Sequence, residues 1–119
     1  MSENPKPPDP LLSDYSNEPD MIELVQGFVE GLTEKVEKIR SLLAEQDLAG
    51  LSALVHQLKG SAGMYGFMPI TQAASDLRQM LDKKRDLAKV AAQCAALTDL
   101  CERARATPDE GTHKDGTHE

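Results

Sequence analysis

The sequence predicts an all-α protein, an antiparallel up-down-up-down four-helix bundle with disordered N- and C-terminal tails. Its apolar residues are dominated by leucine (15) and alanine (13), whereas valine and isoleucine together number eight and aromatic residues make up 3% of the 119. That composition favours packed helices over a β-sandwich or barrel. Four segments repeat apolar residues at spacings of three and four, which is the pattern of amphipathic helices. The segments are joined by short connections, as in an antiparallel bundle.

The first predicted helix covers residues 21 to about 45. Asp20, directly after Pro19, is its predicted N-cap. Gly27 and Gly31 lie off the apolar stripe, where they would allow another element to approach closely at some cost in helix propensity. The heptad spacing is also compatible with a coiled-coil dimer, but three further helices are available to cover the stripe, so we expect a monomer. The stripe consists of Ile22, Val25, Val29, Leu32, Val36, Ile39 and Leu43.

The other three helices have recognisable ends. The second begins near Asp47 and is ended by Gly63 and Gly66. Pro69 fits the first turn of the third helix, and Asp86 is the predicted cap of the fourth. The three stripes are Leu48, Leu51, Val55, Leu58 and Ala62; then Ile70, Ala74, Leu77 and Leu81; then Leu87, Val90, Cys94, Leu97, Cys101 and Ala104.

Composition divides the chain into a body, residues 20–106, and two flexible tails. The proline-rich segment 1–19 and the acidic segment 107–119 each carry a net charge of −3, whereas the body carries −1. Six of the seven prolines lie outside the body, and such flanks are expected to be disordered. Leu11 and Leu12 are candidates for a short turn docked on the body. His113 and His118 of the acidic tail lack fixed geometry and further strong ligands, so we interpret them as solvated rather than as a metal site.

Several classes of protein are disfavoured. The net charge of −7 and the absence of a concentrated basic face argue against binding of DNA or RNA. No apolar run approaches the ~18 residues of a membrane span, and the N-terminus lacks the pattern of a signal peptide, so a cytoplasmic protein is expected. Cys94 and Cys101 would lie about 10.5 Å apart on one helix, beyond the ~7 Å limit for a disulfide, and are predicted to be reduced, buried thiols.

One face of the second helix is not explained by packing. Opposite the leucine stripe, His56 and Lys59 share a face with small residues only, whereas an ordinary solvent face would carry long charged side chains. Gly60, one turn after His56, costs about 1 kcal/mol relative to alanine in a helix interior. We call the small residues of this face, which are predicted to dock a partner, the small-residue face: Ala49, Ser52, Ala53, Gly60 and Gly63.

This arrangement favours nucleophilic chemistry at His56. A neutral imidazole is a nucleophile at physiological pH, and a neighbouring ammonium can neutralise a phosphoryl group attached to it. A metal site is a poorer interpretation, because His56 has no Asp, Glu, His or Cys three or four residues away. A hydrolytic triad would need an orienting acid and an oxyanion hole, and neither can be located. Spacing alone leaves open a histidine that merely sits on the surface.

The string from His56 to Phe67, HQLKGSAGMYGF, resembles the signature of histidine-containing phosphotransfer (HPt) domains, which is His-x-Leu-Lys-Gly-Ser-Ala, then three further residues and then Gly. The resemblance implies that His56 accepts the phosphoryl group, that Lys59 assists electrostatically and that Gly60 gives a partner access. Several family members have a phosphoryl-contacting glutamine 22 positions after the histidine. This chain has Arg78 there, and an arginine can also donate to a phosphate.

The resemblance further implies a phosphorelay intermediate that exchanges phosphoryl groups with receiver domains of response regulators or hybrid histidine kinases. The receiver would supply Mg²⁺, and this chain would need no metal or cofactor of its own. It has no Walker A motif or glycine-rich nucleotide loop, so we expect no autokinase activity. The net charge of +3 over residues 56–89 would help to steer an acidic partner. Two alternatives are a helical adaptor that binds a receiver without carrying phosphate, and metal or haem binding through His56.

Overall fold

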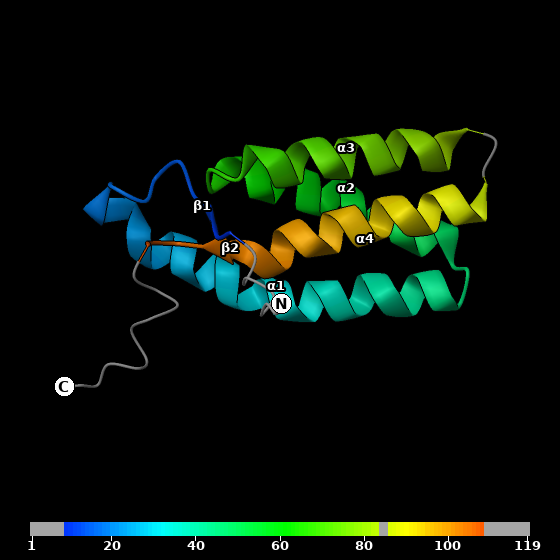
Figure 1. Ribbon diagram of the computed structural model, residues 1–119, viewed down its shortest axis with the longest axis horizontal. Helices are drawn as coiled ribbons and strands as arrows, with labels where there is room; N and C mark the ends of the chain where they lie inside the picture. The colour runs from blue at the N-terminus through cyan, green and yellow to red at the C-terminus, as the bar shows by residue number, and fades with distance from the viewer. Residues whose placement is uncertain (1–8, 84–85, 109–119) are drawn as a thin grey trace, which may run out of the picture.

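The chain folds as the predicted bundle of four antiparallel helices. The computed structural model describes residues 9–83 and 86–108. The helices are α1 (Pro19–Ala44), α2 (Leu48–Met64), α3 (Met68–Asp82) and α4 (Leu87–Arg103). Each helix runs opposite to the one before it, and α4 returns to pack against α1, so the four helices close into a ring (Figure 1). The all-α, up-down-up-down prediction is confirmed.

The core is built from the stripes that the spacing identified. Leu32 and Ile39 of α1, Leu51 and Leu58 of α2 and Leu77 of α3 are almost completely removed from solvent. Because every helix contributes one apolar face, the opposite faces are left for other uses, and the face of α2 that carries His56 is one of them. Further buried core residues are Val25, Val36, Val55, Ala62, Phe67, Ile70, Ala74, Leu81, Val90, Cys94, Leu97 and Cys101.

The helix ends follow local chemistry, with one correction. The Asp47 side chain accepts a hydrogen bond from the Gly50 N–H (2.9 Å), and the Asp86 side chain accepts one from the Ala88 N–H (3.0 Å), so both predicted caps are confirmed. The prediction for Asp20 is wrong. The helix begins two residues earlier than predicted, at Pro19, because the fixed backbone angle of proline suits the first helical position; Asp20 therefore lies in the first turn.

The turn between α2 and α3 also differs from the prediction. Gly63 does not end α2, which continues to Met64, and the reversal occurs at Gly66. Gly66 adopts φ = 84°, a left-handed conformation that glycine adopts without steric cost. The ring of Phe28 in α1 stacks on Tyr65 and Phe67, with centroid distances of 5.0 and 5.9 Å. These contacts fix the turn that follows the His56 helix.

A segment before α1 is ordered on the bundle. The expected docking of Leu11 and Leu12 is confirmed, although they form a strand rather than a turn, and residues 13–18, which were assigned to the flexible tail, are ordered as well. We call residues 11–18 the N-terminal strap. Its strand β1 (Leu11–Leu12) pairs in parallel with β2 (Ala104–Arg105), and its Ser13 is buried. The Ser13 hydroxyl donates to the Tyr65 carbonyl (2.7 Å), and the Asp14 N–H donates to the Gly66 carbonyl (2.9 Å). These bonds satisfy the buried polar groups and attach the strap to the α2–α3 turn.

The same pairing shortens the last helix relative to the prediction. Ala104, expected on the stripe of the fourth helix, is buried in β2 instead, because the chain leaves helical geometry after Arg103. The folded part therefore begins before residue 20. Residues 1–8 and 109–119 of the predicted tails lie outside the described residues. So do Lys84 and Arg85, which belong to residues 56–89, the basic segment with a net charge of +3.

Candidate functional site

His56 lies in the middle of α2, on the side of the helix that faces away from the core. The neighbouring turns place Leu51, Val55 and Leu58 in the core, and a helix with 3.6 residues per turn then directs residue 56 outward. His56 is exposed and is the only histidine among the described residues. The bundle therefore holds this imidazole on a rigid helix while leaving it accessible from outside.

The surroundings of His56 are open where the sequence predicts. Ala49, Ala53 and Gly60 are exposed on the same side of α2. A Cβ atom added at Gly60 would meet no other atom within 4 Å, so nothing in the described chain explains this glycine by packing. Ser52 is half-buried at the edge of the face. The accessible part of the small-residue face is thus broad enough for a macromolecule to approach the imidazole.

The side of α2 that faces α3 is closed. The Thr71 hydroxyl donates to the Lys59 carbonyl (2.8 Å), which ties the two helices together one turn from His56. A Cβ atom at Gly63 would lie 3.2 Å from the Thr71 Oγ1 atom. Gly63 therefore makes room for α3 rather than for a partner, which corrects its assignment to the docking residues. Lys59 is half-buried at this edge, and its ammonium has no ion-pair partner among residues 9–83 and 86–108.

Arg78 lies on the same edge, further along α3. The helices are antiparallel and Thr71 contacts Lys59, so a residue about two turns beyond Thr71 is level with the segment Ser52–His56 of α2. The Arg78 Nε atom is buried and forms no hydrogen bond within the described chain. A buried donor without an acceptor is costly.

Two exposed methionines extend the open side of α2, and the sequence analysis missed both. Met64, the last residue of α2, is 65% exposed, and Met68, the first residue of α3, is 53% exposed. Met64 follows Gly60 by one turn, so His56, Gly60 and Met64 lie in one row. Methionine is flexible and polarizable and adapts to varied apolar surfaces. The sequence did contain an indication that they are exposed, because both methionines fall outside the core stripes.

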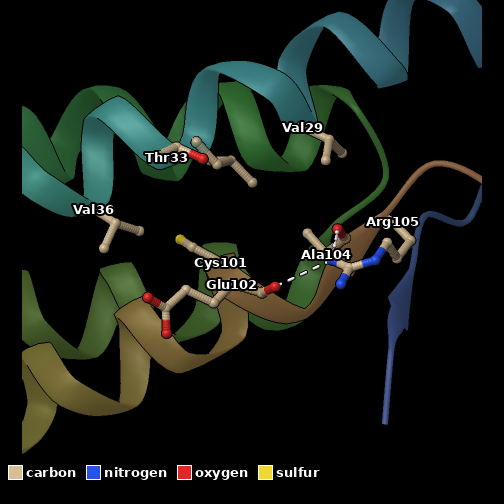
Figure 2. Close-up of a pocket in the computed structure, with 8 residues that line it drawn as sticks. Val29, Thr33, Val36, Cys101, Glu102, Ala104 and Arg105 are labelled. Carbon is tan, nitrogen blue, oxygen red and sulfur yellow. Dashed lines mark hydrogen bonds between the residues drawn. The ribbon is translucent and has the colours of Figure 1, made fainter. Parts of the chain in front are cut away.

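A separate hollow between α1 and α4 contains no residue of the predicted site. It has a volume of about 170 Å³, and Figure 2 shows Cys101 directed from α4 towards α1, with Arg105 at the other end. Burial raises the pKa of Cys101 to about 12, with a further contribution from the negative charge of Glu102, and raises that of Cys94 to about 11. Both thiols are free and buried, so the structural interpretation of the cysteines is confirmed. The hollow is lined by Val29, Leu32, Thr33, Val36, Cys101, Glu102, Ala104 and Arg105.

Candidate metal ligands do not gather at any point of the described chain. Within residues 9–83 and 86–108, no group of three or more His, Cys, Asp or Glu side chains is placed to hold a metal ion. Tail histidines His113 and His118 lie outside this part of the chain. None of the helices described here is long and apolar enough to span a membrane.

The fold and the site together define the class of structure, a four-helix bundle that exposes one histidine of its second helix beside small side chains. Comparison with family models identifies the family: the model of the Hpt domain matches residues 23–107. The chain belongs to the Hpt domain family, whose members are histidine phosphotransfer modules of phosphorelays rather than kinases, and which interact with receiver domains. Searches of curated proteins and of solved structures returned no significant match.

Proposed function

We propose that this chain is a phosphorelay intermediate in which His56 accepts a phosphoryl group from an aspartate of one receiver domain and donates it to an aspartate of another. The observation that carries the proposal is the position of His56, which is exposed on α2 one turn from the open Gly60, within a chain of the Hpt family. The adjoining string from His56 to Phe67 resembles the signature of that family and supports the same histidine.

The transfer requires the lone pair of one imidazole nitrogen. This nitrogen attacks the phosphorus of the aspartyl phosphate, an N–P bond forms, and the P–O bond to the aspartate breaks to leave a free carboxylate. The ring must be neutral at the attacking nitrogen, and the proton on its other nitrogen stays in place during the attack. Donation to the second receiver is the reverse sequence. Because the receiver brings its own acidic pocket and Mg²⁺, no metal or cofactor is needed on this chain.

Lys59 and Arg78 are the proposed electrostatic supports. The free ammonium of Lys59 lies on α2 one turn from His56, and Arg78, whose Nε is unsatisfied, lies on the part of α3 that is level with the segment Ser52–His56. A phosphoryl group on His56 adds negative charge that either cation can neutralise, and a guanidinium can also donate hydrogen bonds to its oxygens. In this proposal the two cations line the α3 side of the phosphorylated imidazole.

The docking surface for the receiver is the accessible part of the small-residue face together with Met64 and Met68. Small side chains around His56 allow the receiver's aspartate to come close, and the methionines supply apolar contact area beyond them. The partners are receiver domains of response regulators or hybrid kinases in the cytoplasm. The docking residues are Ala49, Ser52, Ala53, Gly60, Met64 and Met68.

The test is incubation of the full chain with a phosphorylated receiver. We expect acid-labile, base-stable label on the wild type, no label on the His56→Gln variant, and full label on the matched double variant His113→Gln/His118→Gln. Lys59→Ala should slow labelling while thermal melting is unchanged, and Lys59→Arg should restore it. Label that survives in His56→Gln would overturn the assignment. A wild type that binds the receiver but takes no label would be an adaptor.

A further inference from the structure

A hollow opens in the groove between α1 and α2, directly beside the proposed phosphorylation site. It has a volume of about 340 Å³ and is lined by Phe28 and Lys35 of α1 and by Gln57 and Ser61 of α2. Gln57, the residue after His56, lines the hollow, so the hollow adjoins the helical turn that carries His56, on the side of α2 that faces α1. The Ser61 hydroxyl donates to the Gln57 carbonyl (3.1 Å), so it is already satisfied within the helix.

The wall of this hollow that α1 contributes carries an unpaired cation. Lys35 is half-buried, and its ammonium forms no ion pair or hydrogen bond with any residue in 9–83 or 86–108. None of the residues three or four positions away on its own helix is acidic, since these are Gly31, Leu32, Lys38 and Ile39. By contrast, Arg40 of the same helix pairs with Glu102 at 3.1 Å. The Lys35 ammonium, which has no partner among the described residues, is available to pair with a carboxylate from outside the chain.

The surface of α1 on the same side is also uncovered. Leu24 is 56% exposed, and Cβ atoms added at Gly27 and Gly31 would meet nothing within 4 Å. Each glycine costs about 1 kcal/mol relative to alanine inside a helix, and no close neighbour in the described chain explains the loss. Gly31 is one turn from Lys35, so this apolar strip adjoins the hollow. This exposed apolar strip adds to the evidence for a docking surface, which rests mainly on the hollow and on Lys35.

The two flanks of His56 are therefore unlike. Thr71 occupies the α3 flank, as the 2.8 Å bond to the Lys59 carbonyl shows, whereas the α1 flank is hollow and open and has an unpaired cation of its own, Lys35. We propose that the receiver docks across the α1–α2 groove, with an acidic side chain of one of its helices paired to Lys35 and apolar side chains against Leu24. This inference rests on the proposed function, which it deepens by naming Lys35 as a residue that selects the receiver. Charge complementarity and continuity with the His56 side of α2 identify the receiver as the occupant.

The experiment compares two donors and two positions on α1. One donor is a phosphorylated receiver that labels the wild type, and the other is phosphoramidate, a small donor that transfers its phosphoryl group to an imidazole with loss of ammonia and needs no docking. Lys35→Glu should lower the transfer rate from the receiver by about tenfold or more, because the reversed charge faces a carboxylate. The matched control Lys38→Glu makes the same charge change at an exposed position and should transfer like the wild type. Both variants should be labelled normally by phosphoramidate.

The possible outcomes distinguish a failure of the proposed function from a failure of the docking groove. A wild type that neither donor labels would overturn the proposed function itself. Normal phosphoramidate labelling with equal receiver transfer in wild type, Lys35→Glu and Lys38→Glu would overturn only the groove. If thermal melting shows that Lys35→Glu is unfolded, Lys35→Gln removes the charge with little change in length. It should slow receiver transfer and leave phosphoramidate labelling intact, and unchanged receiver transfer in that variant would equally overturn the groove.

Discussion

Gly60→Leu should make the protein more stable and less active at once. The glycine lies inside α2, and a Cβ atom there meets nothing within 4 Å, so the folded state has room for the new side chain. Leucine is a much better helix former than glycine, and the substitution should raise the free energy of unfolding by about 0.8 kcal/mol. For a domain of this size that gain corresponds to a melting temperature roughly 4 °C higher.

The same side chain would stand about 5–6 Å from the Cβ of His56, one turn along the helix. Transfer requires the imidazole nitrogen and the phosphorus to approach within roughly 3–3.5 Å, and a displacement of 1 Å costs on the order of 100-fold in rate. We therefore expect Gly60→Leu to slow transfer from a phosphorylated receiver about 100-fold, with Gly60→Ala between the two. The defect should persist across a salt series, because steric exclusion is not screened, whereas any steering by the basic segment weakens with salt.

The assay is rapid-quench transfer from the receiver, with thermal melting of every variant. Ala96→Leu is the matched control, because it places the same leucine side chain at an exposed position of α4, and it should transfer like the wild type. A folded, stabilised Gly60→Leu protein that transfers at the wild-type rate would refute the reasoning and would place the docking surface elsewhere.

Three further predictions concern the scaffold. Gly66→Ala should lower the free energy of unfolding by about 2–3 kcal/mol in urea titrations, because φ is 84° and the new Cβ would lie 2.6 Å from the Ser13 Oγ atom. Gly27→Ala, at an open helical position, should raise it. Equal effects of the two substitutions would contradict the close contact between Gly66 and the strap. Asp47→Ala and Asp86→Ala should each lower the free energy of unfolding by about 1 kcal/mol, because each removes a helix N-cap. Asp82 caps no helix N-terminus, so Asp82→Ala should leave the free energy of unfolding unchanged. The buried thiols predict a loss of stability at alkaline pH. On folding, the pKa rises from 9.0 to about 11 for Cys94 and to about 12 for Cys101, because burial favours the neutral thiol. The contribution of the two thiols to the free energy of unfolding is therefore complete below pH 9 and is lost as the pH rises towards those values. Urea midpoints that stay level from pH 8 to about 11 would contradict it.

Local periodicity was sufficient to predict the helices and the exposure of His56. The stripes depend only on residues three and four apart, and the caps at Asp47 and Asp86 bond within three residues, so one sequence contains this information. The strap could not be predicted in the same way. Its strands are two residues long and show no period, and Ser13 bonds to Tyr65, 52 residues away in the chain.

The errors at the site have a related cause. A helical wheel shows which residues share a side of α2, but it does not show where α3 crosses that side, and Gly63 was therefore assigned to the open surface although Thr71 lies against it. The hollow beside Lys35 depends in the same way on how α1 and α2 pack. Met64 and Met68 were overlooked because apolar residues outside a stripe carry no periodic signal that marks them as exposed.

The parallel pairing of β1 with β2 has a consequence for tethered partners. Because Leu11 is beside Ala104, chain entering the domain and chain leaving it meet at one place, and the strap attaches that place to the α2–α3 turn (Figure 1). The turn is ten residues from His56, about 15 Å along the axis of α2. A flexible linker of about ten residues has a root-mean-square span of roughly 17 Å, so a receiver fused at either end would reach the imidazole at an effective concentration near the millimolar range. Fusions at the two ends should therefore be interchangeable, and intramolecular transfer could replace diffusional encounter in either order of domains.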